Sequence, residues 1–107
     1  FVIGFFAVKN IKIPDIAINN INLSNIKDGI YYGEYKTQLV SVKLNVYVKD
    51  NKITKINILK HDNGLGKKAE SITDKIISNQ SLDVDVVSGA TLSSKVILKA
   101  VDNAFNK

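Results

Sequence analysis

Two short loops hold most of the side chains in this sequence that could take part in chemistry, and each precedes a stretch with helical periodicity. The first is His61-Asp62-Asn63-Gly64-Leu65-Gly66, and the second is Asp85-Val86-Val87-Ser88-Gly89-Ala90-Thr91. The first turn of a helix presents unpaired backbone N–H groups and a partial positive charge, a combination that binds phosphate. In the second loop, Gly89 and Ala90 leave the backbone almost bare, and hydroxyl groups lie on Ser88, Thr91, Ser93 and Ser94. These features indicate a site for a phosphate-containing ligand.

A simpler account of the second loop is a turn followed by a helix cap. In that account Ser88 or Thr91 accepts a hydrogen bond from an otherwise unpaired amide. Spacing alone favours this account, because Ser and Thr often precede helices. Glycine pairs such as Gly64 and Gly66 often end strands, and a single histidine such as His61 is more often structural than functional. The residues by themselves leave both accounts open.

The composition limits what chemistry the chain can do alone. It has 107 residues, enough for one domain, with 45% hydrophobic and 23% charged residues. It has no cysteine and one histidine, which excludes disulfides, thiol nucleophiles, iron–sulfur clusters and multi-histidine metal sites. No general acid–base pair is evident, so we predict neither catalytic nor metal-binding residues. Redox or group-transfer chemistry would need a cofactor.

The net charge of +5 is a weak indication of nucleic-acid binding. All fifteen basic residues are lysine, and only Lys67 and Lys68 are adjacent. Arginine is the usual bidentate ligand of phosphate and guanine, and nucleic-acid sites cluster their positive charge. We therefore expect no nucleic-acid partner.

The chain begins with eight apolar residues, 1–8, followed at once by Lys9. A membrane-spanning helix needs about 20 such residues, so we interpret this run as the end of a longer membrane anchor. The alternative is a strand or helix end packed on the core. Residues 10–27 are rich in asparagine and predict a tether whose isoleucines are candidates for docking on the domain. The expected organisation is an anchor and tether over 1–27 and a folded domain over 28–107, located outside the cytoplasm.

The middle of the chain predicts an antiparallel β-meander. Residues 30–35 are aromatic and β-favouring, and residues 40–49 alternate strictly between apolar and polar. Asp50-Asn51 predicts a tight turn, after which residues 53–58 return antiparallel. Alternation slips between Ile53 and Ile56, which predicts a bulge or a late start of the strand.

The second half of the chain predicts two helices. Apolar residues recur at spacings of three and four from about Lys67 to Asn79 and again from about Leu92. Between the helices, residues 82–87 alternate and could form a short strand. The expected fold is α+β, with element order β-β-β-α-β-α and the helices covering one face of the sheet.

The string from Asp85 to Ser94 resembles the signature of the FMN-binding domain family. This family includes the covalently flavinylated subunits of bacterial ion-pumping respiratory complexes and small membrane-anchored extracytoplasmic flavoproteins. The resemblance extends from about Asp28 to Phe105. Its specific part is Asp-x-x-Ser-Gly-Ala-Thr, and the Gly-Leu-Gly loop supports it less specifically.

The resemblance implies that FMN is attached by a phosphodiester bond to the hydroxyl of Thr91. A dedicated flavin transferase would make this bond with FMN taken from FAD, in the presence of Mg²⁺, and Asp85 would belong to what the transferase reads. The cofactor-binding residues implied in this way are Thr91, Ser88, Gly89, Ala90, Asp85, Gly64, Leu65, Gly66 and His61. Longer members of the family often carry Glu-Thr-Pro between the histidine and Gly-Leu-Gly, whereas this chain has Asp62-Asn63, which leaves the contacts of His61 to the flavin ring open.

The expected function is therefore electron transfer by a membrane-anchored, extracytoplasmic flavoprotein domain. Its expected partners are FMN, the transferase, and redox proteins or a quinone, and it would be an electron carrier, not an enzyme. One alternative is a non-redox extracytoplasmic binding module of the same fold without flavin. A second alternative is a domain that binds FMN without a covalent bond.

Overall fold

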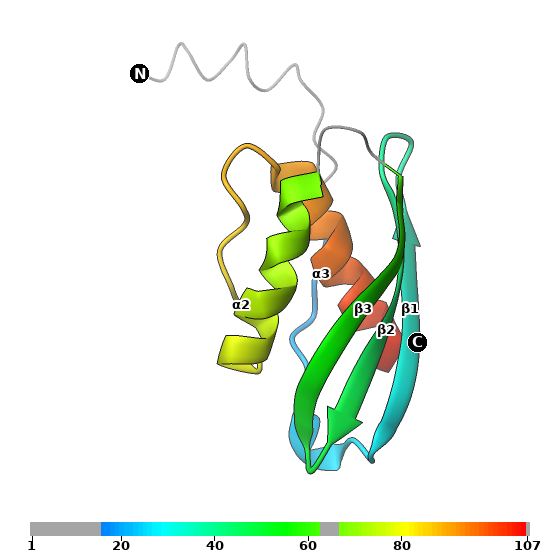
Figure 1. The fold of residues 1–107 in the computed structure, drawn as a ribbon, viewed down its shortest axis with the longest axis vertical. Helices are drawn as coiled ribbons and strands as arrows, with labels where there is room; N and C mark the ends of the chain where they lie inside the picture. Colours follow the sequence, from blue (N-terminus) through cyan, green and yellow to red (C-terminus); the bar gives the residue numbers. More distant parts are fainter. Residues whose placement is uncertain (1–15, 63–66, 107) are drawn as a thin grey trace.

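A three-stranded antiparallel sheet forms one layer of the molecule. The computed structural model describes residues 16–62 and 67–106. Its strands are β1 (Gly29–Lys36), β2 (Ser41–Lys49) and β3 (Lys52–Asp62), hydrogen-bonded in that order (Figure 1). The expected meander is confirmed.

Strand β2 is central, and its apolar and polar residues alternate, so that the apolar side chains face the core and the polar ones the outer face of the sheet. Val42, Leu44, Val46 and Val48 are buried, and the polar residues between them are partly exposed. The turn to β3 places Asp50 and Asn51 at φ 53° and 61°, as a two-residue hairpin turn with both φ angles positive requires. The register then shifts between Tyr47 and Val48, so the irregularity expected near Ile53 is confirmed.

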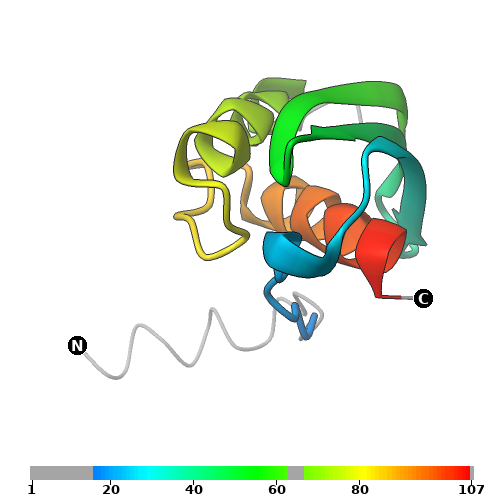
Figure 2. The same ribbon diagram turned by 90° about the horizontal axis from the view of Figure 1, so that it is seen from below.

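Two helices complete the core. A 3₁₀ turn, η2 (Lys67–Ser71), leads into α2 (Ile72–Asn79), and α3 (Thr91–Phe105) ends the domain. Helix α3 lies against one face of the sheet and α2 stands beside β3 (Figures 1 and 2). The side chains of α3 that are fully buried include Val96, Ile97, Ala100 and Val101. The α+β fold is confirmed.

The short strand expected over residues 82–87 does not form. This segment is irregular between α2 and α3, and the amide of Val84 donates to the carbonyl of Leu82, 3.0 Å away. The Gln80 side chain occupies the free edge of β3, because its Oε1 accepts from Ile53 N (2.7 Å) and its Nε2 donates to Ile53 O (2.9 Å). The chain then turns away from the sheet, so the alternating residues have no strand to pair with.

Residues 16–26 pack against the core, so the expected docking of isoleucines from this segment is observed. Ile16 is buried, Ile18, Ile21 and Ile26 lie against the core, and a 3₁₀ turn, η1, spans Leu23–Asn25. The Asn19 amide donates to the Asp102 carboxylate on α3, 3.0 Å away. Burial raises the pKa of Asp102, but hydrogen bonds from Asn19, Asn106 and Lys99 outweigh burial and lower the pKa overall.

The apolar run at 1–8, interpreted as the end of an anchor, lies outside the described residues. Among the helices of the described residues, none is long and apolar enough to cross a bilayer.

Candidate functional site

A tight turn brings the chain into α3. The amide of Ala90 donates to the carbonyl of Val87, 2.9 Å away, and Gly89 between them has φ +80°. A positive φ at the third residue of a four-residue turn is the mark of a type II turn, where glycine is favoured. Gly89 therefore has two roles. It adopts the positive φ that the turn requires, and it leaves the backbone free of a side chain.

A buried serine fastens this turn to the helix. The Ser94 hydroxyl donates to the carbonyl of Ala90 (2.7 Å) and accepts from the amide of Val87 (3.0 Å), and the residue is fully buried. The sequence places Ser94 among the hydroxyls available near a phosphate, but its hydrogen bonds show that it stabilises the turn. The sequence gives no local signal for this role, because the partner amide lies seven residues away.

Thr91 is the first residue of α3, and its side chain is partly exposed. Within the described residues its hydroxyl has no hydrogen-bond partner. The residue at the cap position is Ala90, and no side chain caps the helix. The capping account is therefore not observed, since neither Ser88 nor Thr91 accepts from a first-turn amide. Among the described residues, the threonine oxygen is therefore not used as a helix cap.

A lysine from η2 brings positive charge to the turn. A Cβ atom added to Gly89 would lie 2.7 Å from Lys68 Nζ, so the ammonium group sits directly over the bare backbone. In the described part of the chain, no carboxylate pairs with it. The start of α3 and Lys68 thus put a helix terminus and a cation on the same small surface.

The predicted histidine lies at the end of β3, where it meets η2. His61 Nδ1 is 3.0 Å from Glu70 Oε2, and the imidazole is only 3% exposed. A carboxylate can only accept, so Nδ1 carries the proton. His61 Nε2 is buried and has no hydrogen-bond partner within the described residues. A buried polar group without a hydrogen bond typically costs about 1–3 kcal/mol of folding free energy. Glu70 was not among the predicted site residues.

The remaining predicted residues fall into two groups. Asp85 and Ser88 are exposed on the loop that leads into the turn, and the Asp85 carbonyl accepts from Lys75 Nζ, 3.4 Å away. Gly64, Leu65 and Gly66 lie outside the described residues.

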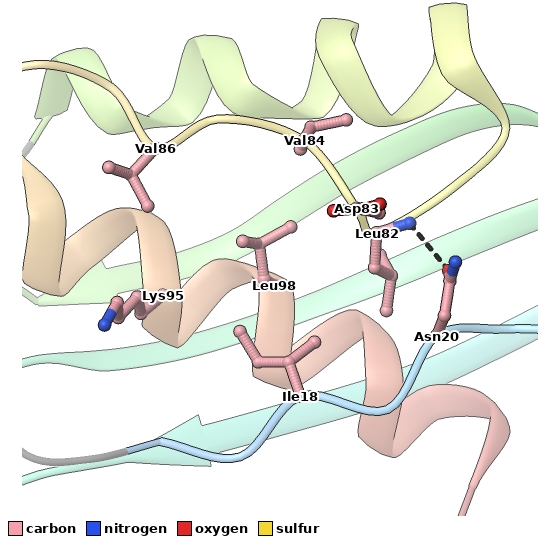
Figure 3. Close-up of a pocket in the computed structure, with 8 residues that line it drawn as sticks. All are labelled: Ile18, Asn20, Leu82, Asp83, Val84, Val86, Lys95 and Leu98. Carbon is pink, nitrogen blue, oxygen red and sulfur yellow. Dashed lines mark hydrogen bonds between the residues drawn. The ribbon is translucent and has the colours of Figure 1, made fainter.

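A cavity of about 410 Å³ opens between the 82–87 segment, the N-terminal segment and α3 (Figure 3). Its lining includes Val84 and Val86 above, Lys95 and Leu98 on α3, and Ile18 below. Lys95 and Leu98 follow Thr91 by four and seven residues, so they share its face of the helix. The lining of the cavity is mainly apolar, and the cavity lies on the face of α3 that also carries Thr91.

A threonine hydroxyl with no partner among the described residues, a bare turn, a helix terminus and a lysine lie together on this α+β domain, an arrangement that suits a phosphate group. A family model described as the FMN-binding domain matches residues 40–106. The chain therefore belongs to the FMN-binding domain family, and FMN binding and electron transfer are the properties that this membership supports.

Three relatives illustrate where such domains occur. An uncharacterised protein of Treponema pallidum is 30% identical over 78% of this chain and 24% of its own length. A urocanate reductase of Eggerthella lenta is 39% identical over 59% of this chain and 11% of its own length. An NADH:acrylate oxidoreductase of Vibrio harveyi is 42% identical over 44% of this chain and 5% of its own length. The chain thus spans less than a quarter of each relative, and two of the three are named as redox enzymes.

Proposed function

We propose that this chain carries FMN through a phosphodiester bond to Thr91 and passes electrons outside the cytoplasm. The observation that carries the proposal is the position of Thr91, a partly exposed residue at the uncapped start of α3 whose hydroxyl has no partner within the described residues. Attachment forms a bond between Thr91 Oγ1 and the FMN phosphorus and breaks the pyrophosphate P–O bond of FAD. AMP leaves, and the hydroxyl proton passes to the transferase.

The residues around Thr91 fit the phosphate of FMN. Once esterified, the phosphate keeps a negative charge, which the first-turn amides of α3 and the Lys68 ammonium group neutralise. Gly89 and Ala90 leave room for its oxygens. The isoalloxazine ring supplies the redox chemistry when bound, and the chain supplies attachment, orientation and charge.

Asp85 and Ser88 are suited to recognition by the transferase. Both are exposed on the loop before the turn, where an enzyme that acts on Thr91 can reach them. We propose that the transferase recognises its substrate through this loop. The chain is then a substrate of that enzyme and an electron carrier, with no catalytic group of its own.

The location and partners follow the same proposal. Residues 1–27 would hold the domain, 28–107, to the outer face of the cell membrane, and residues 16–26 already pack against the domain. Electrons would be exchanged with redox proteins or a quinone. Protease treatment of intact cells, followed by detection of the domain, tests this location, and a domain that stays protected until the cells are lysed contradicts it.

Attachment is tested by intact mass spectrometry after co-expression with a flavin transferase. We expect the mass to rise by one FMN residue and the flavin to stay bound after denaturation. Thr91→Ala should remove the flavin. Thr54→Ala is the matched control, because it deletes an exposed threonine hydroxyl on β3, outside the attachment turn, and it should retain the flavin.

The alternatives predict different results. Flavin that is released by denaturation supports non-covalent binding, and protein that takes up no flavin with the active transferase supports a non-redox binding module. Flavin that remains on Thr91→Ala after denaturation contradicts the assigned oxygen.

A further inference from the structure

Helix α3 and the turn between β1 and β2 meet at one end of the domain. Phe105, the last residue of α3, packs against Tyr31 near the start of β1, with ring centroids 5.1 Å apart, and the Ala100 carbonyl approaches Gly33 further along β1. Helix α3 therefore runs antiparallel to β1 and begins near the end of that strand. The turn of residues 37–40 follows at the same end (Figure 1). We name this the attachment end, because α3 begins there with the proposed attachment residue.

The N-terminal segment that packs on the domain leads to the same end. The Asn19 amide donates to the Asp102 carboxylate on the last turns of α3, whereas Ile18 lines the cavity together with Lys95, which lies nearer the start of the helix (Figure 3). Followed backward, the segment thus runs along α3 toward the attachment end. Ile16 is buried in the core cluster, so the chain is held to the domain from this residue onward.

This docking shortens the free chain between the domain and the proposed membrane anchor. The apolar run ends at residue 8, eight positions before Ile16. Eight positions span at most about 30 Å in any conformation, which is less than the roughly 35 Å length of β3 with its 11 residues. A tether that stayed free up to residue 27 would span about 70 Å and let either end of the domain face the membrane. The docked segment therefore holds the attachment end nearest to the bilayer.

The β1–β2 turn presents an apolar side chain at the attachment end. Leu39 is 71% exposed, the highest value among the large hydrophobic residues in the described part of the chain. The Thr37 hydroxyl oxygen accepts from the amides of Leu39 (3.2 Å) and Val40 (3.0 Å), and the Thr37 amide donates to the Val40 carbonyl (2.7 Å). A single exposed leucine is common on protein surfaces. This leucine is held outward by a well-bonded turn, at the end of the domain that the tether keeps toward the bilayer.

Positive charge accompanies this leucine. Lys36 precedes the turn, is exposed, and has no carboxylate partner within the described residues. Lys60, near the end of β3, pairs with Asp62 at the surface, where both side chains are at least half exposed and such a pair is weak. The chain carries a net charge of +5, which attracts it to anionic lipids. An apolar tip beside a lysine suits the headgroup region of a bilayer, where ammonium groups meet phosphates and apolar side chains enter the acyl boundary.

We infer that the attachment end of the domain docks on the anionic lipid surface of the membrane, with Leu39 in the interface and Lys36 on the lipid phosphates. This inference rests on the proposed membrane location and does not need the flavin. One leucine and a few lysines give weak, salt-sensitive binding, so docking is reversible and the attachment turn stays available to the transferase. In the docked state, flavin on Thr91 faces the membrane, where an electron carrier dissolved in the lipid, such as a quinone, can reach it.

Single cysteine labels test the orientation, because this chain has no cysteine of its own. The full-length protein, with its proposed anchor, carries a fluorophore at Gln38→Cys on the β1–β2 turn or, as the matched control, at Thr54→Cys near the opposite end of the sheet. Both positions are exposed and uncharged. The vesicles contain phosphatidylcholine, phosphatidylglycerol and a lipid whose headgroup carries a quencher. We expect several-fold stronger quenching at position 38 than at position 54.

Variants and lipid composition test the docking surface itself. Leu39→Ser should reduce the quenching at position 38, whereas Ile30→Ser, which removes a similarly exposed apolar side chain near the other end of β1, should not. Replacing phosphatidylglycerol by phosphatidylcholine should also weaken the quenching. Salt at 1 M should do the same, because the Debye length falls to about 3 Å.

The outcomes distinguish this inference from the proposed function. Protein that does not float with the vesicles overturns the membrane location and, with it, this inference. Membrane-bound protein with equal quenching at the two positions, or quenching that Leu39→Ser leaves unchanged, overturns the docking surface alone. A label at position 38 that is not quenched in lipid vesicles but crosslinks to a protein in native membranes indicates a protein partner, which also overturns it. Protein without flavin by mass overturns attachment at Thr91 and leaves the docking measurement valid.

Discussion

Helix α3 can approach β1 closely because residue 33 of β1 is a glycine, and the variant Gly33→Ala tests this contact. A Cβ atom at Gly33 would lie 2.0 Å from the carbonyl oxygen of Ala100 and 2.9 Å from both Cβ and N of Ala104. Real Cβ atoms essentially never approach within 3.0 Å of such atoms. The obstacle is helix backbone, which cannot rotate aside, so α3 must withdraw from β1 by about 1 Å or more.

The expected loss of stability is about 3 kcal/mol, at the upper end of the usual range for overpacking. A domain of this size has a free energy of unfolding of about 5–15 kcal/mol. With an m value of about 1 kcal/mol per M of urea, the denaturation midpoint should fall by about 3 M. Urea titration followed by far-UV circular dichroism measures this shift.

Gly29→Ala is the matched control on the same strand. Its Cβ atom would meet only the Tyr31 side chain, at 3.7 Å, an ordinary contact distance. The midpoint should change by less than about 0.5 M. If Gly33→Ala unfolds within that margin of the wild type, the close approach of α3 to β1 is wrong, and with it the placement of Thr91 relative to the sheet.

Three further predictions concern the turn and the N-terminal segment. Gly89→Ala places a side chain at φ +80° and against Lys68 Nζ, so we expect about 1–2 kcal/mol lower stability and slower flavin attachment, measured as the rate of mass gain. Ser94→Ala removes both hydrogen bonds that fasten the turn; calorimetry should show a loss of about 1–3 kcal/mol, whereas an unchanged melting temperature contradicts this role. Asp102→Asn should speed amide exchange at Asn19. Because hydrogen bonds lower the pKa of Asp102 in the fold, its stabilisation is present at neutral pH and is lost as the pH falls through its folded pKa, which acid titration of the wild type and variant compares.

The sequence predicted those parts of the fold that local rules determine. Alternation over residues 40–49 identified the buried face of β2, and Asp50-Asn51 identified the turn. The same rule failed over 82–87, because alternation reports which side chains are buried and not whether a backbone partner is available. The Gln80 side chain holds the edge of β3 at that point, and no pattern in the sequence signals such a contact.

The candidate site also has one part that the sequence predicted and another part that it did not. The string that ends at Thr91 is continuous, so its turn and helix start could be predicted and its family recognised. Lys68 meets Gly89 because η2 packs against α3, and Glu70 meets His61 because η2 also lies beside the end of β3. Contacts between residues far apart in sequence depend on the whole fold, so Glu70 could not be selected from the other carboxylates beforehand.

The position of Lys68 suits the proposed attachment of FMN at Thr91. A phosphate ester stays charged at any physiological pH, and the Lys68 ammonium group lies directly over the bare backbone of Gly89. Because η2 holds this lysine beside the turn, a change in η2 should affect flavin attachment even when Thr91 itself is unchanged.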